Sequence, residues 1–140
     1  MALSGHNSII LFGDTREDTE FRVERYDPDP ANNEDLGPMQ ERLFASCIGV
    51  GNDVYVIGGR LWDEPGNETD QVDKFNVPTR RWTPCSSLAY PRCSTAVCGV
   101  EVNISADNTQ RENGIIICGG QNMKGESVKI VELFIPRQNR

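Results

Sequence analysis

The sequence predicts an all-β protein, because short runs of strand-forming residues recur three times along its 140 residues. The runs are rich in β-branched and aromatic residues and are bounded by turn-forming residues, as is typical of strands. No window carries a sustained helical stripe, so we expect almost no helix. The first run of each copy ends in glycine, and a second run follows after a polar loop. These pairs are Ile9–Gly13 with Val23–Tyr26, Val54–Gly59 with Val72–Phe75, and Ile115–Gly120 with Val131–Phe134.

The spacing between the copies is regular enough to define a repeat. The first glycines of the three runs lie 45 and 61 positions apart, and the aromatic residues that end the second runs lie 49 and 59 apart. Internal similarity at a period of roughly 20–50 residues predicts a repeat architecture. The chain therefore reads as one domain of about three similar units.

Further residues extend two of the units. Arg42 lies 13 positions before Tyr55, whereas Arg92 lies 24 positions before the equivalent Ile116. The later copy thus holds about 11 extra residues, which fall within 101–113. Because this segment is polar and shows no apolar periodicity, we predict a loop insertion there.

Taken together, these features resemble the Kelch repeat, the blade unit of a β-propeller. The resemblance is greatest to the animal Kelch-like proteins, which combine BTB, BACK and Kelch domains. The first copy differs from the Kelch pattern in two respects: Asp14 replaces the second glycine, and no tryptophan follows. The matching residues are Met39, Arg42, Tyr55, Gly58, Gly59, Phe75 and Trp82 in one copy, Arg92, Gly119, Gly120 and Phe134 in the next, and Gly13 and Tyr26 in the first.

The resemblance implies that residues 1–140 form a partial Kelch propeller of about three blades, built from four-stranded antiparallel sheets. It implies an incomplete blade at 8–36, a complete blade at 42–88, and an incomplete blade at 92–136 with the loop insertion at 101–113. Propellers usually have about 4–8 blades. We therefore expect the arc to expose two apolar blade faces and not to be a stable monomer. The glycines and aromatics named above are expected to form turns and to fill the spaces between blades.

The resemblance also places partner binding on the loops at one rim of the blades. Arg42 and Arg92 stand where some relatives use arginines to hold acidic peptides, and the planar guanidinium suits carboxylates. The alternative is that each arginine braces its own blade by donating to backbone carbonyls. The sequence leaves both interpretations open.

A second candidate contact region is the loop from Arg60 to Gln71. Its acidic residues suggest a partner segment with basic residues, and Leu61 and Trp62 are candidate apolar anchors, since tryptophan is common among binding anchors. The alternative is a solvated loop with the tryptophan tucked against a blade. The candidate residues are Arg60, Trp62, Asp63, Glu64, Glu68 and Asp70.

Composition excludes several classes of function. The net charge of -7 disfavours nucleic-acid binding, and no apolar run is long enough for a membrane helix. His6 is the only histidine, which removes histidine-paired nucleophiles and two-histidine metal sites. We therefore expect no catalytic residue, no metal and no cofactor.

The five cysteines and the N-terminus bear on the compartment. The cysteine count is odd, and Met1 to Asp14 lacks both a positive leader and a long apolar core. We expect a cytoplasmic protein with reduced thiols. Cys47, Cys98 and Cys118 lie in strand-like runs and are expected to be buried, whereas Cys85 and Cys93 lie near turns and are expected to be more accessible.

The resulting functional hypothesis is a protein-binding module and not an enzyme. The resemblance implies substrate recognition in an adaptor of a cullin-RING ubiquitin ligase, in which cullin contact belongs to BTB and BACK domains that these residues do not include. The alternative partner is actin in a cytoskeletal Kelch protein.

Overall fold

A computed structural model of the chain describes residues 9–14, 20–61, 66–107 and 109–140. These residues form three antiparallel sheets and no α-helix. The first sheet holds β1 (Ile9–Asp14), β2 (Phe21–Tyr26) and β3 (Glu34–Pro38); the second holds β4 (Ser46–Val50), β5 (Asp53–Ile57), β6 (Val72–Asn76) and β7 (Arg81–Pro84); the third holds β8 (Ala96–Asn103), β9 (Arg111–Cys118) and β10 (Val131–Phe134). Two short 3-10 helices, Pro30–Asn32 and Pro136–Gln138, complete the structure. Within the described ranges, no helix has the length and apolar character needed to cross a membrane.

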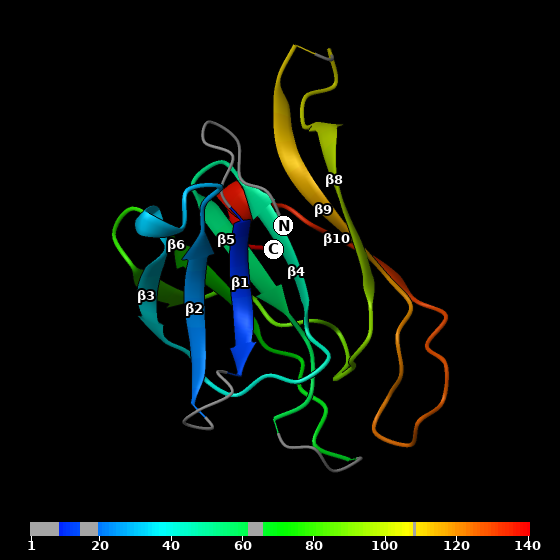
Figure 1. The fold of residues 1–140 in the computed structure, drawn as a ribbon. Helices are drawn as coiled ribbons and strands as arrows, with labels where there is room; N and C mark the ends of the chain where they lie inside the picture. The colour runs from blue at the N-terminus through cyan, green and yellow to red at the C-terminus, as the bar shows by residue number, and fades with distance from the viewer. Residues whose placement is uncertain (1–8, 15–19, 62–65, 108) are drawn as a thin grey trace.

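The sheets stand side by side in chain order, like blades of an arc (Figure 1). Neighbouring strands in each sheet are consecutive in sequence, and the middle sheet has the order β4-β5-β6-β7. This arrangement confirms the predicted all-β class and the single four-stranded blade. The two outer sheets have three strands each.

Two apolar layers hold the sheets together. Between the first and second sheets, the ring of Phe75 meets Phe12 edge to face at 6.2 Å and lies 4.9 Å from Trp82. Between the second and third sheets, Tyr55 meets Phe134 at 5.8 Å. Because side chains alternate between the two faces of a strand, β6 contributes to both layers, with Phe75 in the first and Val72 in the second.

The glycine pair after β5 allows the third sheet to approach the second. Gly58 has a φ of 59°, and a Cβ atom built there would lie 2.4 Å from the carbonyl oxygen of Arg92. The next amide, of Gly59, donates to that same carbonyl at 2.9 Å. Glycine is therefore required here both by the backbone conformation and by the close contact.

The first sheet has a strand that the sequence did not indicate. β3 pairs with β2 although its sequence, Glu34–Pro38, holds few strand-forming residues and no tryptophan. It is held by the burial of Leu36 at 3% exposure and by the Arg22–Asp35 ion pair. A β-bulge between Val23 and Glu24 adjusts the register of the pairing.

The predicted loop insertion at 101–113 is too long at both ends, because 101–103 and 111–113 belong to strands and only 104–110 lie between them. β8 runs to Asn103 and β9 starts at Arg111, so the extra residues lengthen a hairpin that projects beyond the body of the molecule (Figure 1). The strand signal was present in the alternation of Val100 and Val102 with polar residues, which has the period of a strand. Only the segment between the two strands is a loop.

Candidate functional site

The loops that the sequence singled out lie at one end of the sheets. This end, called the rim below, comprises residues 40–45, 58–61, 66–71, 90–95 and 119–130, and it faces downward in Figure 1. Isolated bridges join the loops in the same way in both blades: Leu43 pairs with Arg60, and Cys93 pairs with Gln121. The amide of Ser94 donates to the carbonyl of Phe44 at 2.9 Å, which connects the second blade to the third.

Arg42 is buried inside its own blade. Its Nη1 donates to the carbonyl of Gly58 at 3.1 Å and its Nη2 to the Asp73 carboxylate at 2.6 Å. Nη2 also donates to the Gln71 side chain at 3.0 Å. The side chain of Arg42 is 2% exposed, so it presents almost no surface to a partner.

Arg92 repeats this arrangement in the third blade. Its Nη1 donates to the carbonyls of Gly119 at 3.0 Å and Ile130 at 3.2 Å, and its Nη2 pairs with Glu132. The Arg92 side chain is fully buried. Both arginines thus have the bracing geometry that the sequence left open as one of two interpretations, with carbonyls and a carboxylate of the same blade as acceptors.

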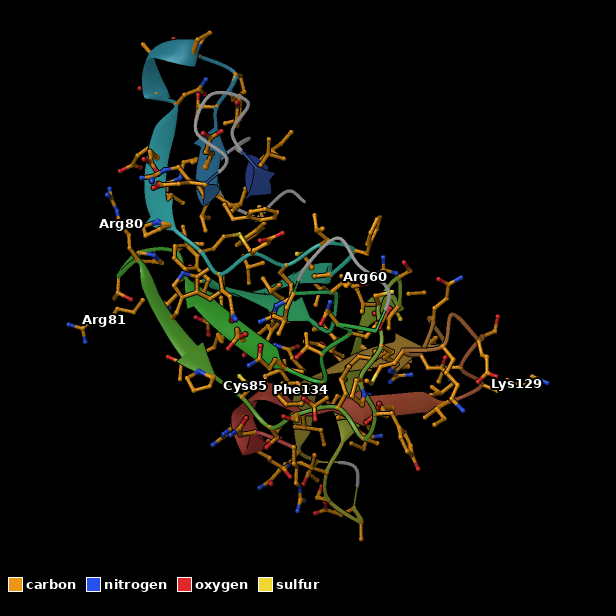
Figure 2. The ribbon with its side chains drawn as sticks, turned by 90° about the horizontal axis from the view of Figure 1, so that it is seen from below. Arg60, Arg80, Arg81, Cys85, Lys129 and Phe134 are labelled. Carbon is orange, nitrogen blue, oxygen red and sulfur yellow. The ribbon has the colours of Figure 1, made fainter. Side chains whose placement is uncertain are left out.

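Arg60 is the most exposed of the rim arginines, with a side chain that is 15% exposed, against 2% for Arg42 and 0% for Arg92. Its Nε lies 3.2 Å from the Glu68 carboxylate, and its guanidinium carbon lies 5.2 Å from the centre of the Phe44 ring. A cation over an aromatic face is attracted by the ring quadrupole. Figure 2 views this end of the molecule and shows Arg60 within the outline of the face, whereas Lys129 projects outward from its side.

Phe44 has an unusual backbone for an aromatic residue. Its φ is 54° and the residue is 55% exposed. Positive φ is rare for bulky residues and costs on the order of 1–3 kcal/mol. Ser94, the equivalent residue of the third blade, has a φ of 53°. The two copies of the repeat therefore share the backbone conformation, whereas only the second blade has an aromatic ring at this position.

Arg60, which lies beside Phe44, and Glu68, which pairs with Arg60, are also specific to the second blade. The position of Arg60 is occupied by Gln121 in the third blade, and the position of Glu68 by Ser127, with the same bridge pairing. The repeat therefore folds without the aromatic, the cation and the carboxylate. Phe44 is the exposed member of the three, and an exposed loop residue that the scaffold does not need is a candidate for function.

In the predicted acidic loop, Glu68 is less accessible than the sequence suggested. Glu68 is buried, with its side chain 1% exposed, because it accepts from Arg60 and from the Gly66 amide. Its charge is therefore unavailable to a basic partner. Trp62, Asp63 and Glu64 lie outside the described residues.

The exposure of two cysteines differs from the prediction. Cys93 is 2% exposed and Cys98 is exposed, the opposite of the predicted pattern. Burial raises the pKa of Cys47 to about 11. Within the described ranges, no group of histidine, cysteine and acidic residues is arranged to hold a metal ion.

Sequence reasoning missed the exposed apolar side chains of the rim. Phe44, Tyr90 and Met123 are each more than half exposed. Arg42 and Arg92 hold the same position in two copies of the repeat. Phe44 lies two residues after Arg42, and Ser94 lies two residues after Arg92. Comparing the copies position by position would have singled out Phe44 as a departure.

Comparison with known families agrees with this geometry. Residues 41–89 match the family model described as Kelch motif. The match starts one residue before Arg42, includes all four strands of the middle sheet and ends shortly after β7. Residues 41–89 therefore resemble a Kelch motif, and the three antiparallel sheets are arranged as in part of a Kelch β-propeller.

Proposed function

We propose that the chain is a protein-binding module whose contact centre is the Phe44–Arg60 pair on the rim. The observation that carries the proposal is an aromatic ring that is 55% exposed on a strained backbone, at a position where the next blade has serine. The third blade keeps this backbone conformation with serine at the same position, so the scaffold accounts for the conformation and not for the exposed ring. Kelch repeats are interaction modules, and aromatic and arginine residues dominate binding energy at protein interfaces.

The geometry favours a partner segment with an apolar or aromatic side chain. The Phe44 ring offers an exposed apolar surface beside Arg60, whose Nε is already committed to Glu68. Asp70 is proposed to face basic residues of the partner, as are Trp62, Asp63 and Glu64, whose positions lie outside the described residues. This arrangement supports a peptide ligand and gives no support to catalysis.

A peptide-display selection on the immobilised chain tests the proposal. Peptides that bind the wild type are titrated against Phe44→Ala, and we expect their affinity to fall at least tenfold because the apolar anchor is lost. Ile104→Ala is the matched control, since Ile104 is 39% exposed in the β8–β9 loop, outside the rim. Retained affinity of all selected peptides for Phe44→Ala contradicts the proposal, provided that circular dichroism shows an unchanged fold.

Two classes of partner are proposed for this surface. The first is a ubiquitination substrate, as in the Kelch-like adaptors of cullin-RING ligases; the second is actin. Sedimentation with actin filaments separates them: pelleting that Phe44→Ala abolishes favours the cytoskeletal partner. A chain that binds selected peptides and stays in the supernatant favours the adaptor.

A further inference from the structure

Each outer sheet has one face that no other described sheet covers. On the first sheet this face shows Ile9, Leu11 and Tyr26, which are 45%, 46% and 43% exposed. On the third sheet it shows Val131 and Leu133, which are 67% and 47% exposed. Below, the leading face of a sheet is the face toward the preceding sheet, and the trailing face is the face toward the following sheet.

The exposed leading face has two buried equivalents in the chain. Ile9, Leu11 and Tyr26 hold the repeat positions of Val54, Val56 and Phe75. These three residues of the second sheet are at most 2% exposed, and their counterparts in the third sheet are at most 5% exposed. The counterparts are Ile115, Ile117 and Phe134. The same three positions are thus buried wherever a preceding sheet is present.

The exposed trailing face follows the same rule at the other end. Val23, Val72 and Val131 are equivalent, and their exposures are 0%, 1% and 67%. Val23 belongs to the core between the first and second sheets, and Val72 to the core between the second and third. Only the last copy of the position has no sheet against it among the described residues.

The trailing face of the third sheet is apolar across all three strands. Cys98 pairs with Ile116, which pairs with Leu133, so these three side chains form one row. Ala96, Cys118 and Val131 form the neighbouring row. A continuous apolar surface of this kind marks an interaction site.

The two uncovered faces are therefore opposite halves of an interface that the chain already forms twice. We infer that two copies of the chain associate head to tail, with the leading face of each first sheet packed on the trailing face of the other copy's third sheet. Both contacts form at once, and they close six sheets into a ring. Six lies within the range of about 4–8 blades found in propellers, and a heterologous contact that closes gives a finite ring.

The head-to-tail arrangement is favoured over contact between like faces. In the chain, the aromatic of each leading face contacts a trailing face: Phe75 lies against Phe12 and Phe134 against Tyr55. Tyr26 holds the same position and has Ile116 and Cys118 as the equivalent partners in the second copy. Two leading faces would instead bring together the Arg22 and Asp35 ion pairs of both copies.

Single charged substitutions test the inference by light scattering coupled to size-exclusion chromatography. The wild type is expected at twice the mass of the chain. Leu11→Glu on the leading face and Leu133→Glu on the trailing face are each expected to elute as monomers, because each places a charge in both contacts of the ring. Ile104→Glu, an exposed control in the β8–β9 loop, is expected to remain dimeric.

Mixing the two monomeric variants distinguishes head-to-tail contact from contact between like faces. Leu11→Glu retains a native trailing face and Leu133→Glu retains a native leading face, so an equimolar mixture is expected to form a heterodimer through one intact contact. If like faces pair, one of the two variants remains dimeric alone and mixing restores nothing.

Thiol labelling gives an independent readout of the same face. Cys98 is exposed on the trailing face of the single chain and becomes covered in the ring. We expect a neutral maleimide to label Cys98 at least tenfold faster in Leu133→Glu than in the wild type. Cys47 serves as the internal reference because burial raises its pKa to about 11.

Two results overturn the inference. One is a wild-type chain that is folded and monomeric at high micromolar concentration with Cys98 freely labelled. The other is a concentration-dependent series of open oligomers, which shows that the contacts do not close. Neither result bears on Phe44, so a failure here is separate from a failure of the rim proposal.

Discussion

At the scale of the residue, Arg42 and Arg92 show how one side chain fixes a blade. The guanidinium of Arg42 links the carbonyl of Gly58, after β5, to Asp73 in β6. The guanidinium of Arg92 links the carbonyl of Gly119, after β9, to Glu132 in β10. A buried guanidinium is tolerated because carbonyls and a carboxylate satisfy its terminal nitrogens. The repeat pattern predicted the positions of these arginines. It could not decide between bracing and partner binding, because that choice depends on how far the following strands bury each side chain.

Arg92→Met is expected to lower the free energy of unfolding by about 3–5 kcal/mol, since it removes the cation paired with Glu132 and the guanidinium donor of the Gly119 carbonyl. Urea denaturation followed by circular dichroism measures the loss. Arg92→Lys is expected to recover only part of it, because an ammonium lacks the planar fork.

Arg111→Met is the matched control for this experiment. Arg111 pairs with Glu101 at the surface, where the two side chains are 64% and 67% exposed. Exposed pairs of this kind contribute little, so we expect a change within about 0.5 kcal/mol. Equal losses for the two variants would show that burial of Arg92 has no energetic consequence.

At the scale of the element, the long β8–β9 hairpin is the main departure from the sequence prediction. The strand period was visible at Val100 and Val102, but the surrounding polar residues suggested a loop. β3 was missed for the opposite reason: its residues are poor strand formers, and tertiary contacts of Leu36 and Arg22 determine its conformation. The strands with β-branched runs were predicted because propensity and packing agree there.

The hairpin loop contains a pH-sensitive contact. Asp107 accepts hydrogen bonds from Ser105 and Thr109, which lower the pKa of its carboxyl from 3.8 to about 2. A lowered folded pKa stabilises the loop conformation above pH 3.8, and this contribution is lost as the pH falls toward 2. NMR titration of the Asp107 carboxyl should give a midpoint near 2, and Thr109→Ala should move it upward. An ordinary midpoint in the wild type would contradict the contact.

At the scale of the whole molecule, the arc follows from the repeat. The period, the glycines and the aromatics predicted three related sheets, and the structure confirms them with one complete blade. The rim residues Phe44, Arg60 and Glu68 were not predicted as a group, because the third blade has other residues at all three positions and a repeated pattern therefore does not reveal them. Positions that the copies share predict the fold, and positions at which they differ indicate candidate functional residues.

Association of two copies makes thermal stability depend on concentration. If both end faces are covered in the dimer, the Tm of the wild type is expected to rise by several degrees over a hundredfold increase in chain concentration, since binding to the native state stabilises it by mass action. Leu133→Glu is expected to show a constant Tm. Calorimetry at three concentrations is sufficient, and a constant Tm in the wild type would contradict the dimer.

Because the rim positions of the second and third blades are equivalent, the number of binding sites in one chain could be doubled. Ser94, Gln121 and Ser127 have the backbone positions of Phe44, Arg60 and Glu68, including the left-handed φ at the first of them. Grafting phenylalanine, arginine and glutamate onto these three positions would give one chain two copies of the same contact surface. A ligand with two linked epitopes would then meet its second site at an effective concentration near the millimolar range. The scaffold itself would set the spacing between the two sites.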